Sequence, residues 1–193
     1  MIQSLPTRDT WAEAAADRLA GALAEALTAN GRALFAGSGG STPSPIYARL
    51  AQADLDWTKV TATLVDERYV PEASPASNAA LLKQTLLTGP AATVRFIPLY
   101  SPAVTVDRAA ALASQALAAE GRPLDAVLLG MGEDGHICSM FPGSPTLTTL
   151  LTPGLKPAVY GVPAGRDGAA PPQERLTLNL PWLVSARRVV LAL

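Results

Sequence analysis

The apolar positions of the chain alternate between helical spacing and short continuous runs. From Trp11 onward apolar residues repeat at helical spacing, and Thr10-Trp11-Ala12-Glu13 has the spacing of a capping box. We therefore predict a helix that starts at Thr10 and that Gly31 terminates. Similar patterns predict further helices at 43–53, 78–87 and 105–120. Short apolar runs predict strands at 32–36, 60–65, 94–97, 124–129, 158–162, 176–180 and 188–193.

Strands that alternate with helices predict an α/β fold. We expect a single-domain, Rossmann-like, mainly parallel sheet flanked by helices on both faces, because parallel strands need helical crossovers that cover the sheet. The length of 193 residues suits one domain spanning 1–193, and no repeat or linker divides it. The proline- and glycine-rich stretch 142–172 is expected to be mostly loop. The apolar run at the end, 188–193, is expected either to form an edge strand or to be followed by further natural residues.

Composition and charge narrow the possible partners. A net charge of −1 gives no basic excess, so we expect no nucleic-acid partner. Charged residues interrupt the alanine-rich segment 11–30, which favours an amphipathic surface helix over a membrane span. The single cysteine, Cys138, suits a reducing compartment, and the N-terminus has no export signal. We expect a cytoplasmic monomer that acts on a small molecule, with no membrane partner.

The first loop of chemical interest is Gly37-Ser38-Gly39-Gly40-Ser41-Thr42, directly after a predicted buried strand. Its glycines let the backbone approach a ligand closely, and the N–H groups and three hydroxyls attract an anion. No Gly-Lys-Ser/Thr follows, so the loop is not a nucleotide-binding P-loop. The segment is either an anion site or a tight strand-to-helix turn.

A second loop, Asp66-Glu67-Arg68, places three charges directly after another apolar strand. Such charges must be exposed or paired, so this segment is either part of a site or a solvated loop with a structural Asp–Arg pair.

The third loop, Gly130-Met131-Gly132-Glu133-Asp134-Gly135-His136, holds the only histidine of the chain. A nearby carboxylate can orient an imidazole, so His136 is a candidate general base, although a lone histidine is more often structural. We expect no metal, since neither a second histidine nor a second thiol is present.

These loops together resemble one protein family. The run from Leu128 to His136, followed by Ser139-Met140-Phe141-Pro142-Gly143, resembles the signature of 6-phosphogluconolactonases. Gly39-Gly40-Ser41-Thr42-Pro43, Asp66 to Pro71 and Glu174-Arg175-Leu176-Thr177-Leu178 resemble further motifs of that family in the same order. The related glucosamine-6-phosphate deaminases typically continue after the histidine into Phe-Asn-Glu-Pro, whereas here Cys138-Ser139-Met140-Phe141-Pro142 is of the lactonase type.

The resemblance implies hydrolysis of 6-phospho-D-glucono-1,5-lactone to 6-phosphogluconate in the oxidative pentose phosphate pathway, without a cofactor. His136 would be the general base, Arg68 would position the lactone or stabilise the oxyanion, and Asp66 would orient Arg68 or a substrate hydroxyl. The substrate would also contact the glycine-rich loop at 37–42, together with Gly132, Asp134 and Gly135.

The sequence departs from the family pattern at two places. Family members carry a lysine before the Glu-Arg-Leu-Thr motif, thought to hold the phosphate, but the segment 163–168 contains only Arg166 as a cation. We expect Arg166 to take that role. Family members also continue past the last strand into a glycine-lysine segment and a C-terminal helix, so the resemblance implies that this chain lacks its natural C-terminal helix.

Three alternatives remain open at the level of sequence. One is a deaminase or isomerase that acts on a sugar phosphate with the same scaffold. Another is a sugar-phosphate sensor without catalytic activity. A third is nucleophilic catalysis by Cys138 or Ser139 near His136, for which the sequence shows no third partner.

Overall fold

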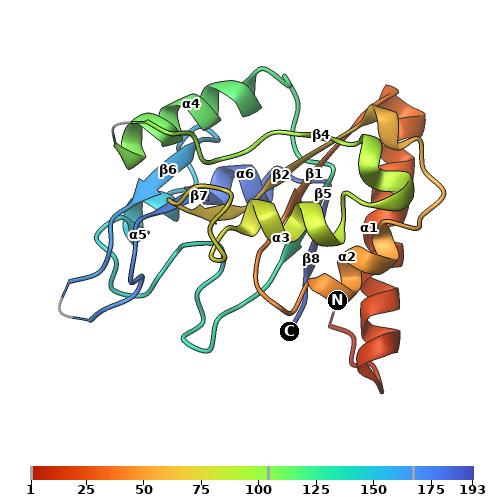
Figure 1. Cartoon of the computed structure of the whole chain (residues 1–193), viewed down its shortest axis with the longest axis horizontal. Helices are drawn as coiled ribbons and strands as arrows, with labels where there is room; N and C mark the ends of the chain where they lie inside the picture. The colour runs from red at the N-terminus through yellow and green to blue at the C-terminus, as the bar shows by residue number, and fades with distance from the viewer. Residues whose placement is uncertain (1, 104, 167) are drawn as a thin grey trace.

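The computed structural model describes residues 2–103, 105–166 and 168–193. Its larger sheet has five strands in the order β4-β2-β1-β5-β8, and each adjacent pair is parallel (Figure 1). This confirms the predicted α/β class with a mainly parallel sheet. The strands are β1 (Ala33–Gly37), β2 (Val60–Leu64), β4 (Arg95–Phe96), β5 (Ala126–Leu129) and β8 (Arg188–Leu191).

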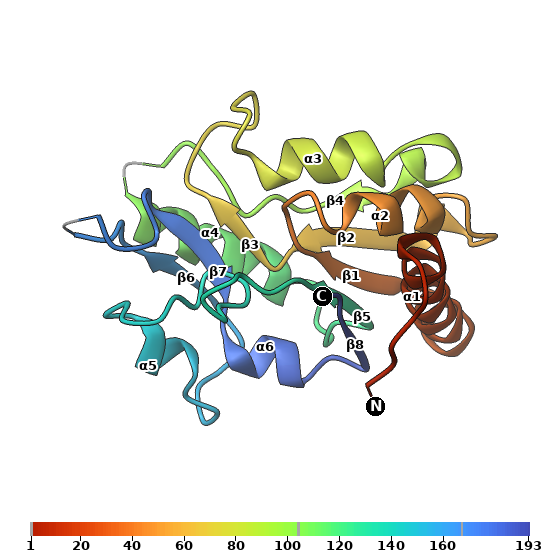
Figure 2. The ribbon, with the colours of Figure 1, turned by 90° about the horizontal axis from the view of Figure 1, so that it is seen from below.

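Helices cover this sheet on two sides, as predicted. Helix α1 packs against β1, β5 and β8, while α4 packs against strands of a second sheet. Both views of the ribbon place α1 and α4 on opposite sides of the large sheet (Figures 1 and 2). The helices are α1 (Arg8–Asn30), α2 (Ser44–Leu50), α3 (Asn78–Thr85), α4 (Val106–Ala118), α5 (Leu147–Leu150) and α6 (Leu180–Val184), with 3-10 turns η1 (Trp57–Lys59) and η2 (Gly89–Thr93).

Helix α1 begins one turn earlier than predicted. The N-cap is Thr7, whose side chain accepts a hydrogen bond from the N–H of Thr10, while the Thr10 hydroxyl accepts one from the N–H of Thr7. The capping box predicted at Thr10 and Glu13 is therefore wrong. The observed box joins Thr7 and Thr10, and the sequence pattern did not indicate it because a threonine takes the place of the usual Glu or Gln. The predicted end is confirmed, since Gly31 adopts the left-handed conformation with φ of 68°.

A second, antiparallel sheet was not predicted. It has three strands in the order β3-β7-β6: β3 (Asp66–Arg68), β7 (Arg175–Leu178) and β6 (Val159–Val162). The interpretation of 66–68 as a solvated loop is wrong, because this charged segment pairs with β7. The strand predicted at 176–180 also ends at Leu178, and α6 begins at Leu180.

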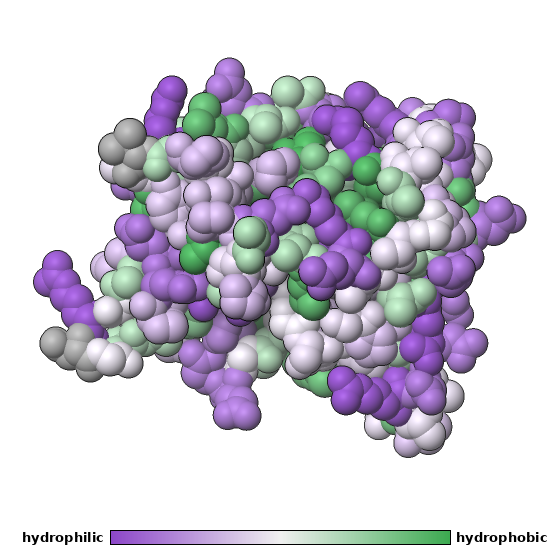
Figure 3. All heavy atoms as spheres, viewed as in Figure 1, coloured by the Kyte–Doolittle hydropathy of each residue, from purple (hydrophilic) through white to green (hydrophobic). Residues whose placement is uncertain are grey.

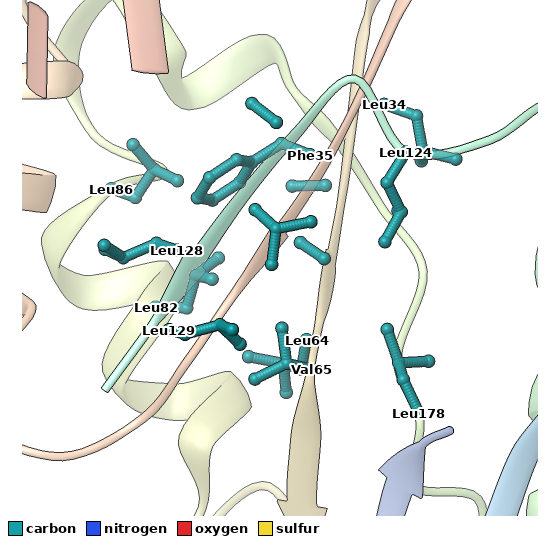
Figure 4. Close-up of a cluster of buried hydrophobic side chains, with 14 of the residues drawn as sticks. Leu34, Phe35, Leu64, Val65, Leu82, Leu86, Leu124, Leu128, Leu129 and Leu178 are labelled. Carbon is teal, nitrogen blue, oxygen red and sulfur yellow. The ribbon is translucent and has the colours of Figure 1, made fainter. Parts of the chain in front are cut away.

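One part of the core lies where α3 meets the large sheet. Figure 4 shows Phe35 of β1 and Leu128 of β5 buried in the same cluster as Leu82 of α3. Leu64 of β2 and Leu86, which directly follows α3, belong to the same cluster. Burying one such side chain contributes roughly 1.5–3 kcal/mol. Polar side chains are spread over the face seen in Figure 3, with apolar ones in small separate areas. None of the described helices is long and apolar enough to cross a membrane.

The strand order places three loops at one edge of the sheet. Strand β1 lies between β2 and β5, and all three strands run in the same direction. Their carboxyl ends therefore meet, and the chain leaves them through the loop at 38–43, the junction between β2 and β3 at Val65, and the loop at 130–136. In open α/β sheets this edge is where ligands bind. The last strand, β8, lies at the far edge of the sheet and pairs with β5.

Candidate active site

The three predicted loops line one pocket with a volume of about 350 Å³. Most of the predicted site residues lie on it: Ser38, Gly39, Gly40, Ser41, Thr42, Asp66, Arg68, Gly132 and His136. Several lining residues were not predicted: Asn78, Gly130, Met131, Cys138, Phe141 and Arg175. Four predicted residues lie outside the lining: Gly37, Asp134, Gly135 and Arg166.

The glycine-rich loop after β1 is packed too closely for side chains at two positions. A Cβ on Gly39 would lie 1.8 Å from Oδ1 of Asn78, and a Cβ on Gly37 would lie 2.4 Å from the Tyr47 hydroxyl. That hydroxyl donates a 2.6 Å hydrogen bond to the carbonyl of Ser38 and fixes the start of the loop. Gly37 thus lies against Tyr47 and outside the pocket lining, whereas Gly39 is one of the residues that line the pocket.

This loop offers unused hydrogen-bond donors to the pocket. Among the described residues, no acceptor is found for the N–H groups of Gly39, Gly40, Ser41 and Thr42. Within the same part of the chain, the buried hydroxyl of Ser38 also has no partner. Buried polar groups are normally satisfied, so the unpaired hydroxyl of Ser38 favours a ligand here. The four N–H groups lie on partly or fully exposed residues, where an anionic or hydroxyl-bearing ligand can reach them.

Successive charged side chains of β3 lie on opposite faces of the strand. Asp66 and Arg68 line the pocket, whereas Glu67 contacts the start of α3 on the other face. The Asp66 carboxylate accepts a 2.7 Å hydrogen bond from the hydroxyl of Ser139. In the part of the chain that the structure describes, Asp66 and Arg68 do not form the ion pair considered as an alternative. The Arg68 guanidinium instead donates through Nη1 to the carbonyl of Ala76 at 2.6 Å.

Arg175 is the main pocket residue that sequence reasoning missed. It lies opposite Arg68 in the antiparallel register of β3 and β7, and its guanidinium carbon lies 5.6 Å from the ring centroid of Phe141. Burial, and then the charge of Arg68, lower the pKa of Arg175 from its ordinary value. The Nε atoms of both arginines are buried and have no partner among the described residues. The family motif that contains Arg175 is a signal that could have identified it.

Arg166, the predicted phosphate ligand, lies elsewhere. Its side chain is exposed, and it lines a separate hollow between the segments 142–145, 163–166 and 169–170. The structure therefore does not bring Arg166 together with the other predicted residues.

His136 reaches the pocket from the loop after β5. Its Nδ1 lies 2.5 Å from Oδ1 of Asp134, and its ring packs on Phe141 with centroids 4.2 Å apart. The hydrogen bond from His136 lowers the pKa of Asp134, so Asp134 is an ionised acceptor at neutral pH. A neutral imidazole that donates from Nδ1 leaves Nε2 as its basic nitrogen. A Cβ on Gly132 would lie 2.3 Å from the imidazole, so any side chain here would displace the ring of His136.

Neither neighbouring nucleophile suits covalent catalysis. Burial, and then the charge of Asp66, raise the pKa of the Cys138 thiol well above its ordinary value, which leaves it protonated. Ser139 is fully buried, and its hydroxyl donates to Asp66. Among the described residues, no group of three His, Cys, Asp or Glu side chains forms a metal-binding cluster.

Comparison with known proteins identifies the family. The sequence profile of glucosamine-6-phosphate isomerases/6-phosphogluconolactonase matches residues 6–193, and the chain belongs to this family. It is 47% identical over 180 residues to the 6-phosphogluconolactonase of Rhizobium meliloti (strain 1021), covering 93% of this chain and 76% of that protein. It is 40% identical over 190 residues to the 6-phosphogluconolactonase of Caulobacter vibrioides, covering 98% of this chain and 81% of that protein.

The fold agrees with solved structures of 6-phosphogluconolactonases. The crystal structure of a 6-phosphogluconolactonase from Shewanella baltica OS155 superposes with a TM-score of 0.89 at 34% identity, covering 98% of this chain and 78% of that one. The 6-phosphogluconolactonase of Trypanosoma brucei superposes with a TM-score of 0.80 at 26% identity, covering 99% and 80%. The similarity to lactonases thus extends over nearly the whole chain.

Proposed function

We propose that this protein hydrolyses 6-phospho-D-glucono-1,5-lactone to 6-phosphogluconate in the oxidative pentose phosphate pathway, and is thus a carboxylic ester hydrolase. The observation that carries the proposal is a histidine, oriented by Asp134, in the same pocket as two arginines and a loop of unused N–H donors. A sugar-phosphate lactone requires these three elements: a base for water, a stabiliser for the oxyanion and an anion site. The similarity to relatives named 6-phosphogluconolactonase supports the choice of substrate.

The phosphate would lie between the glycine-rich loop and Arg175. The N–H groups of Gly39 to Thr42 supply donors, and Arg175 supplies the positive charge that was predicted for Arg166. In this lactone, only the ring oxygen, C5, C6 and the ester oxygen separate the carbonyl carbon from the phosphorus. Neighbouring arginines can therefore serve both ends, with Arg175 at the phosphate and Arg68 at the carbonyl.

The chemistry needs only proton transfer and charge stabilisation. Neutral His136 removes a proton from water through Nε2 while the water oxygen attacks C1. The carbonyl oxygen gains negative charge, which Arg68 stabilises. The C1–O bond to the ring oxygen then breaks, and the imidazolium returns its proton to that leaving oxygen. This gives the open-chain acid without a covalent enzyme intermediate.

Asp66 is assigned to a substrate hydroxyl. Ser139 occupies Oδ2 of its buried carboxylate, and among the described residues no hydrogen bond is found to Oδ1. Since Asp66 lines the pocket, Oδ1 is the atom we assign as the acceptor for a sugar hydroxyl. This favours the second of the two roles considered for Asp66 from the sequence.

Acid release tests the function directly. The protein should accelerate acid release from freshly prepared phosphorylated lactone above the spontaneous rate. Ammonia release from glucosamine 6-phosphate without lactone hydrolysis would favour the deaminase alternative. Tight binding of the sugar phosphate without turnover would favour the sensor. The proposal also keeps the prediction of a cytoplasmic monomer, which cell fractionation and light scattering would test.

A further inference from the structure

Glu67 is a buried carboxylate that does not line the pocket. It is 1% exposed and has no Lys, Arg or His partner among the described residues. Burying such a charge is unfavourable unless hydrogen bonds compensate for the lost water. Four donors do so here, and all of them come from β3 or from the start of α3.

These four contacts join the two segments that hold pocket residues. Oε1 accepts from the N–H of Arg68 at 2.7 Å and from the N–H of Asn78 at 2.8 Å. Oε2 accepts from the N–H of Ala79 at 2.8 Å and from the hydroxyl of Ser77 at 3.1 Å. Arg68 and Asn78 both line the pocket, so one carboxylate binds the backbone of two pocket residues.

The guanidinium of Arg68 adds a further hydrogen bond between the two segments that this carboxylate joins. Its Nη1 donates at 2.6 Å to the carbonyl of Ala76, the residue that precedes Ser77. The Asn78 side chain adds a second link, since Nδ2 donates at 3.0 Å to the carbonyl of Asp66. Glu67 thus fixes the Ala76 carbonyl relative to the backbone of β3, and that carbonyl determines where the guanidinium points.

We propose that Glu67 is a positioning residue for catalysis, which aims Arg68 at the reacting carbonyl by tying the start of α3 to β3. The role of Arg68 itself rests on the proposed function. A carboxylate is required because four donors converge on two oxygens. A glutamine of the same shape turns an NH₂ group toward two of those donors, so the Ala76 carbonyl shifts. A displacement of about 1 Å in a catalytic group can reduce the rate about 100-fold.

The test compares Glu67→Gln with Glu72→Gln in lactone hydrolysis. Glu72 lies in the loop between β3 and α3, is exposed and pairs with Lys83 of α3, so it is a control for loss of a carboxylate that no buried donors contact. Glu67→Gln should lower kcat by about 10- to 100-fold with KM changed less than about threefold. Glu72→Gln should change neither value by more than about twofold. Equal effects of the two substitutions would overturn the proposal.

A double-mutant cycle separates positioning from simple stabilisation. If Glu67 acts through Arg68, Glu67→Gln should change kcat less than about twofold in an Arg68→Gln background. Multiplicative losses would show that Glu67 does not act through Arg68. Should Glu67→Gln fail to fold, Ser77→Ala removes only one of the four contacts. It should give a smaller loss of kcat that also disappears in the Arg68→Gln background; a loss that persists there would contradict the proposal.

The Arg68 Nη1–H signal in NMR comes from the group that donates to the Ala76 carbonyl, and it gives a readout that is independent of lactone hydrolysis. Arg68→Gln assigns this signal by removing it. In the unaltered protein the signal should be protected from exchange, and Glu67→Gln should speed its exchange while Glu72→Gln does not. An unaltered protein without lactonase activity would contradict the proposed function alone, because this measurement still tests Glu67. An unchanged Arg68 signal in Glu67→Gln would overturn the positioning role.

Discussion

Arg68 and Arg175 lie directly opposite each other across β3 and β7, and both guanidinium groups belong to the same pocket. Like charges at directly opposed positions destabilise a sheet. Within the described part of the chain, neither arginine has an acidic partner. The two positive charges repel each other, the charges of Asp66 and Glu67 counteract this repulsion, and a multiply charged anion bound between the arginines would relieve it further. This relationship underlies the assignment of the phosphate to Arg175.

Replacing Arg175 by Gln should weaken binding of the phosphorylated lactone specifically. Loss of a charge-assisted contact of about 1.5–3 kcal/mol raises KM by about 10- to 150-fold. Hydrolysis of unphosphorylated glucono-1,5-lactone should change less than about twofold. Arg166→Gln is the matched comparison, because Arg166 is exposed and lies outside the pocket. If the phosphate-specific loss appears in Arg166→Gln instead, the original prediction is right and the assignment to Arg175 is wrong.

Asp134 should support His136 in catalysis and should remain ionised well below neutral pH. Asp134→Asn removes the charged acceptor at Nδ1, so kcat should fall by about 10- to 100-fold, less than for a buried triad carboxylate. The pKa of Asp134 is lowered, so its contribution is present above the ordinary carboxyl range and is lost only as pH falls through that lowered pKa. Between the ordinary carboxyl range and neutral pH, the ratio of kcat/KM between the unaltered protein and Asp134→Asn should therefore stay constant. A ratio that changes over this range in pH–rate profiles would contradict the prediction.

Gly132 should be intolerant of even one methyl group. Gly132→Ala places Cβ where the imidazole now lies, so the ring must move and kcat should fall by about 100-fold. The melting temperature should change little, because the loop is at the surface. Gly154→Ala provides the comparison, since a Cβ there meets no atom within 4 Å and should leave kcat unchanged. Full activity in Gly132→Ala would mean that the position of His136 is not critical.

The Cys138 thiol should be unreactive and dispensable. Burial and the charge of Asp66 raise its pKa, so alkylation by iodoacetamide at neutral pH should be slow until the protein unfolds. Cys138→Ala should retain kcat within a few fold. A loss of activity comparable to that of a His136 variant would instead support nucleophilic catalysis by the thiol.

The sequence predicted those parts of the pocket in which a buried apolar run is followed directly by glycine or charged residues. The loops at 37–42 and 130–136 follow strands that are buried at every position, so their location at the edge of a parallel sheet followed from the pattern. Arg175 was not predictable in this way. Its proximity to Arg68 depends on the pairing of β3 with β7, two segments far apart in the sequence. Asp66-Glu67-Arg68 contains no apolar residue, and the alternation of Leu176 and Leu178 in β7 does not indicate which strand is its partner.

The solvated-loop alternative for Asp66-Glu67-Arg68 failed for a related reason. A run of charges normally indicates a solvated loop, yet Asp66 and Glu67 are 6% and 1% exposed. Their burial is possible because donors from Ser139 and from the start of α3 satisfy the carboxylates. Those donors are supplied by tertiary structure, which local spacing does not reveal.

We propose that His136 activates water for attack on the phosphorylated lactone. The experiment that tests this role compares the initial rate of acid release from freshly prepared lactone, corrected for spontaneous hydrolysis, by the unaltered protein and by His136→Asn. We expect the unaltered protein to accelerate acid release clearly. We expect the variant to lose kcat on the order of 10²–10⁴-fold, with KM and melting temperature nearly unchanged. A folded His136→Asn variant that keeps most of its kcat would rule out His136 as the base.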